Sequence, residues 1–156
     1  MDAYGHVNNV VQLRLLEEAR VRALGSPTQS RDAAVGPGEY GAAEVVSGLP
    51  MPEVFGAASA TTELLVASHA IEYRAPISYR PGPIAVDLVI SEVRPASVTI
   101  SYVIVEPDGS LVYTVSETVI AFVDQASGRP RRLSEEEIVA LESVVRAPAR
   151  MRSLRR

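Results

Sequence analysis

Residues 2–20 read DAYGHVNNVVQLRLLEEAR, and this stretch decides how the rest of the chain is interpreted. It places a carboxylate, a glycine, a histidine and two asparagines directly before a segment with helical spacing of its apolar residues. Asn8 or Asn9 can act as the N-cap, because a short side-chain acceptor satisfies a backbone N–H group of the first turn. Gly25 and Pro27 end the helix. The N–H groups at such a helix start favour negative charge, including the oxyanion that develops when a carbonyl is attacked.

The predicted helix has two apolar stripes. Leu15, Leu16, Ala19 and Ala23 share one face, and Val10, Leu13 and Leu24 form the other stripe. We therefore expect the helix to contact more than one surface, such as an enclosing sheet and a partner subunit.

The composition narrows the classes of function. With 156 residues the chain fits one domain. Hydrophobic residues make up 47% of it, yet no apolar run approaches the ~20 residues of a membrane span, and the start lacks a signal pattern. We expect a cytoplasmic protein that does not act at a membrane. Without cysteine there is no thiolate nucleophile, and two histidines cannot by themselves furnish a usual zinc site, so we expect no metal.

The charge is acidic overall and basic at one end. A net charge of −4 argues against general nucleic-acid binding. All fifteen basic residues are arginine, and five of them stand near the C-terminus: Arg146, Arg150, Arg152, Arg155 and Arg156. We expect residues 1–146 to form a single domain and residues 147–156 to form a basic, disordered tail.

Residues 28–60 are rich in Gly, Pro, Ala and Ser and have few apolar groups. Such a long connection is unusual in a compact domain. A lid facing the substrate and a disordered connection are both consistent with this composition.

After residue 61 the pattern becomes that of β-structure. Alternation of apolar and polar residues predicts strands over residues 64–77, 84–93, 97–106 and 111–124. On the first of them His69, Ile71 and Tyr73 share one face. A capping box at Ser134 and Glu137 opens a short helix that reaches about residue 145. One helix followed by strands joined by tight turns is an α+β pattern with an antiparallel sheet, and strands of this length predict a sheet curved around the helix.

These residues resemble the hotdog-fold acyl-CoA thioesterases of the 4-hydroxybenzoyl-CoA thioesterase type. The family's motif D-x-x-G-H-V-N-N, followed by a helix ending in E-x-A-R, stands here at Asp2, residues 5–9 and residues 17–20. Residues 71–77, 92–98 and 122–130 are similar to parts of the family's sheet. The resemblance implies the hotdog fold, a long curved antiparallel sheet wrapped around one central helix. The family carries a further strand ahead of the aspartate, where this sequence has only Met1, so we expect the N-terminal strand to be missing here, either because the true start lies upstream or because the sheet lacks that strand.

The resemblance also implies the catalytic residues Asp2, His6 and Asn9. Asp2 would attack the thioester carbonyl or activate a water molecule, and the backbone N–H of Asn9 would bind the thioester oxygen. His6 would bond to the substrate carbonyl or to Asp2, or would only hold the turn. Glu17 or Glu18 would assist the water, or would only take part in a charged stripe on the helix.

The implied substrate-binding residues are Gly5, Asn8, Arg94 and Ser97, the last two at the nucleotide end of coenzyme A. A second option for the phosphates is the group Arg129, Arg131 and Arg132, since arginine suits phosphate recognition.

The implied activity is hydrolysis of an acyl-CoA thioester to a free acid and coenzyme A. Coenzyme A is part of the substrate, so no separate cofactor is expected. The pantetheine tunnel of hotdog proteins runs between subunits, which implies a homodimer or homotetramer. Two alternatives stay open: a thioesterase acting on acyl carrier protein, and a non-catalytic acyl-CoA-binding hotdog module.

Overall fold

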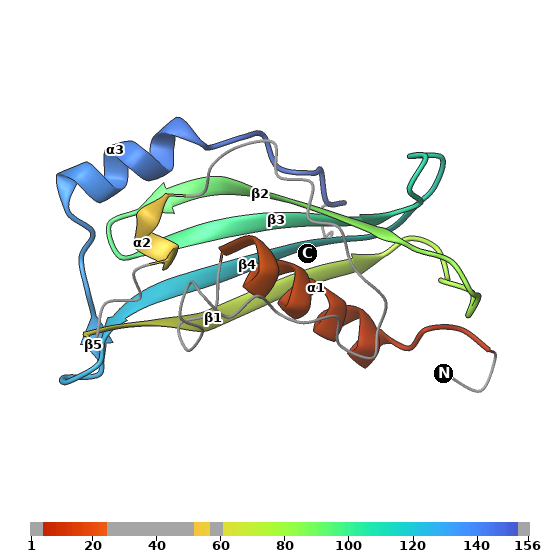
Figure 1. The fold of residues 1–156 in the computed structure, drawn as a ribbon, viewed down its shortest axis with the longest axis horizontal. Coiled ribbons are helices and arrows are strands. Elements are labelled where there is room, and N and C mark those ends of the chain that lie inside the picture. Colours follow the sequence, from red (N-terminus) through yellow and green to blue (C-terminus); the bar gives the residue numbers. More distant parts are fainter. Residues whose placement is uncertain (1–4, 25–51, 57–60, 153–156) are drawn as a thin grey trace.

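Helix α1 (Asn9–Leu24) lies against the concave face of one curved antiparallel sheet (Figure 1). The computed structural model describes residues 5–24, 52–56 and 61–152. The strands are β1 (Thr62–Tyr73), β2 (Ala85–Arg94), β3 (Ser97–Val105), β4 (Val112–Asp124) and the short β5 (Arg129–Pro130). Along the sheet they follow the order β1-β4-β3-β2, with β5 paired to β4. The predicted α+β class and the sheet wrapped around one helix are therefore confirmed.

The core fills the space between α1 and the concave face of the sheet. Leu16 and Leu24 of α1 are buried there against a row of fully buried β3 side chains: Val98, Ile100, Tyr102 and Ile104. These four residues alternate along β3, so one face of the strand supplies the centre of the core.

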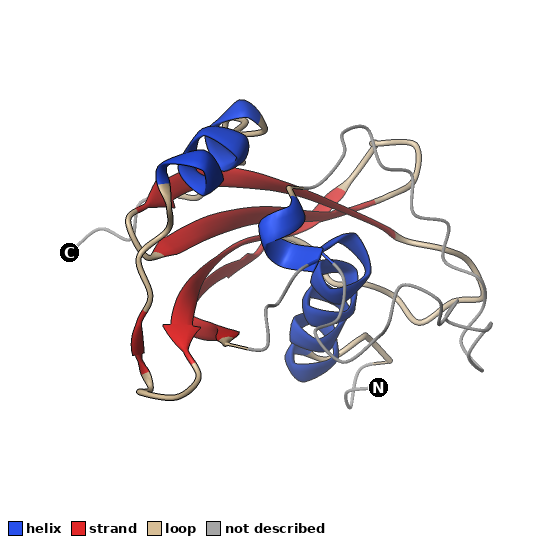
Figure 2. Cartoon of the chain, turned by 60° about the vertical axis from the view of Figure 1, so that its left-hand side comes forward, coloured by secondary structure: helices blue, strands red, loops and turns tan. Residues whose placement is uncertain are grey.

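A second helix that the sequence analysis did not predict caps one end of this core (Figure 2). Helix α2 (Glu53–Gly56) belongs to the stretch predicted as a long connection, and the remaining residues of that stretch lie outside the described part of the chain, apart from Pro52. Phe55 is 1% exposed and packs on Phe122, with 6.1 Å between ring centroids. Phe55 therefore connects this stretch, which has few apolar residues, to the hydrophobic core.

Helix α3 (Glu135–Ser143) begins at the predicted capping box. The Ser134 hydroxyl accepts a hydrogen bond from the Glu137 N–H, and the Glu137 carboxylate accepts one from the Ser134 N–H. Leu141 is fully buried and fixes the helix to the rest of the domain, beside β2.

Both strands at the outer sides of the four-strand order contain a β-bulge. In β1 the pairing with β4 shifts between Val66 and Ser68, so Ala67 is an extra residue. The shift reverses the alternation of side chains: Leu64 and Ile71 both pack against the core, although an uninterrupted strand would place them on opposite faces. The pairing of β2 with β3 shifts in the same way between Ile90 and Glu92. Bulges bend and twist a strand, which suits a sheet that curves around α1.

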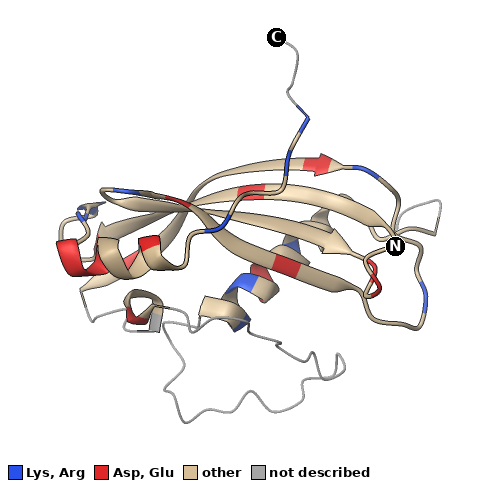
Figure 3. Ribbon diagram, turned by 90° about the horizontal axis from the view of Figure 1, so that it is seen from above, with Lys and Arg blue, Asp and Glu red and all other residues tan. Residues whose placement is uncertain are grey.

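After α3 the chain crosses the convex face of the sheet (Figure 3). The backbone N–H of Arg146 donates to the Ile90 carbonyl of β2 at 2.9 Å, and that of Ala149 donates to Ser101 Oγ of β3 at 3.1 Å. The Arg152 N–H reaches Glu72 of β1 at 2.6 Å. Within the predicted basic tail, residues 147–152 thus make specific contacts with the sheet, and residues 153–156 lie outside the described part.

Candidate active site

The loop ahead of α1 is held by a short antiparallel pairing with residues that follow β1. Val7 N–H donates to the Ile77 carbonyl at 2.9 Å, and Tyr79 N–H donates to the Gly5 carbonyl at 3.2 Å. His6 forms the bridge between these two bonds, opposite Ser78. Gly5 has a φ of 80°, a left-handed conformation that a residue with a Cβ atom rarely adopts. The glycine of the motif is therefore required by the turn that directs His6 toward the sheet.

Asn8 is the N-cap of α1. Its Oδ1 accepts a hydrogen bond from the Val11 N–H at 2.9 Å, and its carbonyl accepts the first helical bond from the Gln12 N–H. Asn9 is consequently the first residue of the helix. The first backbone N–H groups of a helix, including that of Asn9, have no acceptor within the helix. Such an N–H group can donate to an oxyanion.

Gln12 connects the loop, the helix and the sheet. It is 3% exposed, and its Nε2 donates to the Val7 carbonyl at 3.3 Å. Its Oε1 accepts a hydrogen bond from Thr114 Oγ1 on β4. A buried amide with a donor and an acceptor satisfied in this way fixes the position of the motif relative to the sheet.

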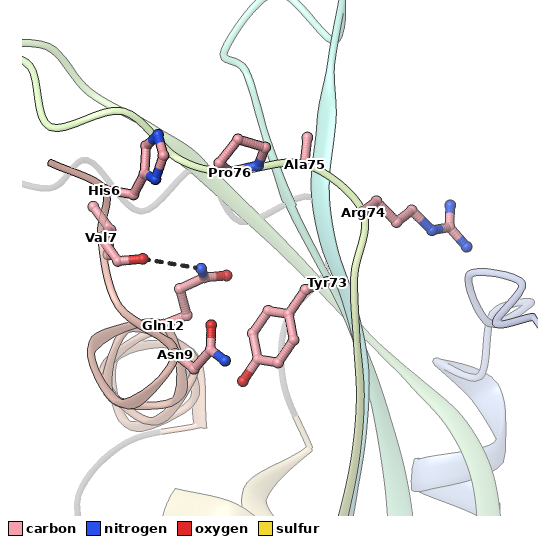
Figure 4. Close-up of a pocket in the computed structure, with 8 residues that line it drawn as sticks. All are labelled: His6, Val7, Asn9, Gln12, Tyr73, Arg74, Ala75 and Pro76. Atoms are coloured by element: carbon pink, nitrogen blue, oxygen red, sulfur yellow. Dashed lines mark hydrogen bonds between the residues drawn. The ribbon is translucent and has the colours of Figure 1, made fainter. Parts of the chain in front are cut away.

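A cavity of about 230 Å³ lies between the start of α1 and the end of β1 (Figure 4). His6, Val7, Asn9 and Gln12 line one side, and residues 73–76 line the other. Tyr73 points across the cavity toward Asn9. The cavity thus opens directly at the helix start, where the negative charge of an attacked carbonyl would be stabilised.

The structure brings some of the predicted site residues together and separates others. Gly5, His6, Asn8 and Asn9 share the loop and helix start at the cavity, whereas Asp2 lies outside the described residues. Arg94 and Ser97 lie at the β2–β3 turn. Ser97 pairs with Ala121 of β4, whereas Tyr73, which lines the cavity, pairs with Thr114. Seven residues of β4 separate these positions, about 23 Å at the rise of an extended strand, so within one chain they are at opposite ends of the sheet.

Three of the charged residues named from the sequence, Arg94, Glu18 and Arg131, have side chains that are already paired. Arg94 contacts Glu92 at 3.1 Å in an exposed pair, and Glu18 contacts Arg14 at 3.1 Å on the outer face of α1. Arg131 donates hydrogen bonds to both carboxylate oxygens of Glu137, and its guanidinium also lies over the Phe122 ring. Both contacts hold the side chain at the edge of the core.

A second group of polar side chains lies further along α1, between the helix and the concave face. Arg20 Nη1 donates to the Tyr102 hydroxyl at 3.4 Å, and His69 Nδ1 is 2.8 Å from Thr118 Oγ1. Burial, followed by the charge of Arg20, lowers the pKa of His69 below its ordinary value of 6.5, while Glu17 acts in the opposite direction. His69 is therefore kept neutral near pH 7, and Glu17 is close enough to influence it.

Two kinds of site residue were missed from the sequence. Gln12 stands among the apolar residues of the helix and was not singled out, although a polar side chain at i−4 from the buried Leu16 signals an internal hydrogen bond. Tyr73, Ala75 and Pro76 were recognised as part of a family-like segment, but nothing in their spacing indicated that this segment faces the helix start.

Comparisons with known proteins agree with this fold. Residues 1–147 match the thioesterase-like superfamily. The structure is similar to that of the probable thioesterase YbaW from Escherichia coli, with a TM-score of 0.67, 22% identity, and coverage of 94% of this chain and 91% of that chain. It is also similar to a putative acyl-CoA thioesterase from Xanthomonas campestris, with a TM-score of 0.55, 26% identity, and coverage of 84% and 88%.

A third similar structure is Slr0204, a 1,4-dihydroxy-2-naphthoyl-CoA thioesterase from Synechocystis, with a TM-score of 0.61, 15% identity, and coverage of 92% and 88%. The search of curated proteins found no match.

A curved antiparallel sheet around a central helix, with a cavity at the helix start, defines an α+β protein of the hotdog type. The chain belongs to the thioesterase-like superfamily and is a thioester hydrolase. None of the helices in the described residues is long and apolar enough to cross a membrane.

Proposed function

We propose that this protein is an acyl-CoA thioesterase, which hydrolyses a thioester to a free acid and coenzyme A. The observation that carries the proposal is the cavity of about 230 Å³ that opens at the first turn of α1, between His6 and Tyr73. The superfamily match and the coenzyme A thioesters named for two similar structures support the choice of substrate class.

In the proposed reaction the thioester carbonyl oxygen accepts a hydrogen bond from the backbone N–H of Asn9. The negative charge that develops on this oxygen is stabilised by the start of α1. Asp2, three residues before Gly5, either attacks the carbonyl carbon or removes a proton from an attacking water molecule. In both routes the carbon–sulfur bond breaks and coenzyme A leaves as a thiolate, a good leaving group that takes up a proton from solvent. In the nucleophilic route this leaves an anhydride between the acyl group and Asp2, which a water molecule then hydrolyses to the free acid and the original carboxylate.

His6 is proposed to bond to the substrate carbonyl or to the Asp2 carboxylate, and its place at the cavity supports this role. Gly5 and Asn8 act through the turn and the helix cap that position it. Arg94 and Ser97 stay a prediction for the nucleotide end of coenzyme A. Their distance from the cavity means that they would serve the site of another subunit.

A homodimer or homotetramer is part of the proposal. Strand β1 lies at an outer side of the four-strand order, and Leu65, Val66 and Tyr73 on it are 48%, 43% and 39% exposed. An outer strand with exposed large apolar residues favours pairing with another chain. Sedimentation analysis over a range of protein concentrations would test it, and a monomer throughout would contradict it.

The test of the activity is release of free thiol from a panel of acyl-CoA substrates by the purified protein. Asp2→Asn and Asp2→Ala are expected to lower kcat by at least about 100-fold, the size expected for loss of a general base or nucleophile. Asp87→Asn, at an exposed carboxylate of β2, is the matched control and is expected to keep the original rate. Turnover close to the original in both Asp2 variants would refute the role of Asp2, and no thiol release from any substrate would refute the proposed function.

A further inference from the structure

The C-terminal segment, residues 146–152, brings arginines to the end of β1. Its backbone is fixed to β2, β3 and β1 in turn, through Ile90, Ser101 and Glu72. Because these three bonds are made by the backbone N–H groups of the segment, the side chains of Arg150 and Arg152 are not needed to hold the path. Both residues are exposed, and the side chain of Arg152 is 84% exposed.

Arg152 joins Arg74 at a single carboxylate, and the backbone carbonyl of Arg150 contacts Arg74. Arg74 Nε donates to Glu72 Oε1 at 2.8 Å, and Arg74 Nη2 donates to the carbonyl of Arg150. Arg152 Nε lies 3.7 Å from the same Glu72 oxygen. The two guanidinium groups at Glu72, those of Arg74 and Arg152, exceed its single negative charge.

Most of the donors in this group remain for a ligand. A guanidinium has five N–H donors, and Arg74 uses one for Glu72 and one for Arg150. The short bonds to Glu72 also lower the pKa of its carboxyl, first through the Arg152 N–H and then through Arg74, so the carboxylate that orders the arginines stays charged. A guanidinium that is held by a carboxylate and has spare donors, as in Arg74, suits a phosphate.

The group lies next to the candidate active site. Arg74 stands between Tyr73 and Ala75, both of which line the cavity, and its side chain leads away from the cavity (Figure 4). Glu72 faces the convex side, since it alternates with Tyr73 along β1. The cavity and the arginines are therefore on the two sides of the same short stretch of an outer strand.

We propose that Arg74, Arg150 and Arg152 form a phosphate-binding surface for the nucleotide end of a coenzyme A thioester whose acyl group lies in the cavity. This inference rests on the proposed function. The long pantetheine arm joins the thioester to the phosphates and would pass around the chain at residues 74–76. Arg94, by contrast, is paired with Glu92 at the far end of the sheet.

The test compares two substrates with the same acyl group, an acyl-CoA and the corresponding acyl-pantetheine, which lacks all of the phosphates. The variants are Arg150→Gln, Arg152→Gln and the double variant, because these changes remove the guanidinium and keep the backbone bonds. Arg22→Gln, at an exposed arginine in the last turn of α1, is the matched control. Arg94→Gln tests the alternative position.

We expect each C-terminal variant to raise KM for the acyl-CoA by about 3- to 10-fold, the range for loss of one exposed guanidinium–phosphate pair. The kcat, and the KM for acyl-pantetheine, should stay unchanged, and added salt should reduce the difference. Unchanged KM values, equal effects on both substrates, or a rise in KM confined to Arg94→Gln would overturn the inference.

Binding of coenzyme A itself, measured by calorimetry, separates this inference from the proposed function. If no thiol is released by the original protein, the proposed hydrolysis fails, yet weaker coenzyme A binding by the C-terminal variants would still support the phosphate surface. Equal coenzyme A affinity in the original protein and the double variant would refute it.

Discussion

Replacement of Gln12 by leucine tests whether the buried amide holds the catalytic loop in place. The variant keeps the size and the helix preference of the side chain but removes both hydrogen bonds. Thr114 is 1% exposed, so loss of the amide oxygen strands its hydroxyl in the core. The Val7 carbonyl is only half-buried and its bond is long, at 3.3 Å, so it regains water more readily.

The expected loss in the free energy of unfolding follows from these two environments. A buried hydroxyl without a partner costs about 1–3 kcal/mol, and a partly exposed hydrogen bond contributes about 0.5 kcal/mol, so Gln12→Leu should destabilise by about 2 kcal/mol. Thr114→Val should cost a similar amount, because it leaves the buried amide oxygen of Gln12 without its partner. In the double variant both partners are apolar, so it should cost about 1 kcal/mol instead of the additive value of about 4 kcal/mol, which gives a coupling energy of about 3 kcal/mol.

Urea unfolding followed by circular dichroism at one fixed protein concentration measures all four proteins, since the stability of an oligomer depends on concentration. Thiol release measured in parallel should show a lower kcat for Gln12→Leu, because the loop moves relative to the cavity. Costs that simply add in the double variant, with a coupling energy below about 0.5 kcal/mol, would show that the amide and the hydroxyl do not act as a pair and would refute this reasoning.

Three further predictions concern other parts of the chain. Phe55→Ala should lower the free energy of unfolding by about 3–5 kcal/mol, as expected for loss of a buried aromatic ring, and a cost under about 1 kcal/mol in urea unfolding would show that α2 is not part of the cooperative core. Ser134→Ala removes the acceptor of the α3 capping box and should cost about 1 kcal/mol, whereas Ser110→Ala in an exposed turn serves as its comparison. The pKa of His69 is lower in the folded protein than in the unfolded chain, so on acidification the unfolded chain binds a proton at this residue first. The contribution of neutral His69 to the free energy of unfolding should therefore be fully present above about pH 6.5 and should fall below that pH. His69→Asn should lose less stability than the original protein between about pH 7.5 and pH 5.5, and identical pH profiles would contradict the assignment.

Much of the fold follows from local patterns in the sequence. The alternation of Val98, Ile100, Tyr102 and Ile104 predicted a half-buried strand, and all four side chains are fully buried on one face of β3. The capping box at Ser134 is formed as predicted. These features depend on residues that are close together in the chain, so the alternation of apolar residues and the capping motif are sufficient to predict them.

Features that depend on distant segments could not be predicted in the same way. Strand β1 ends at Tyr73 rather than at residue 77, because the N–H groups of Arg74 and Ala75 both donate to the Tyr113 carbonyl and the chain then turns to pair with the loop before α1. The crossing of residues 146–152 depends on acceptors on β2, β3 and β1 that no local pattern reveals.

The candidate site was predicted only in part for the same reason. The loop residues Gly5, His6, Asn8 and Asn9 came from one continuous motif, and the structure places the motif at a cavity. The opposite wall, at Tyr73 to Pro76, is contributed by a segment more than sixty residues away. The role of Asp2 stays a prediction.

The extra residue Ala67 in β1 lets the outer strand bend without disturbing the residues that follow it. After the bulge Tyr73 faces the cavity and Glu72 faces the convex side, in a register with β4 that differs by one residue from that at the start of the strand. Deletion of this single alanine would place Ser68 directly after Val66, opposite the same β4 residues, so both faces would keep their side chains and only the bulge, with its local bend and twist, would be lost. The length of β1 can therefore change by one residue at this position without moving Tyr73 away from the cavity.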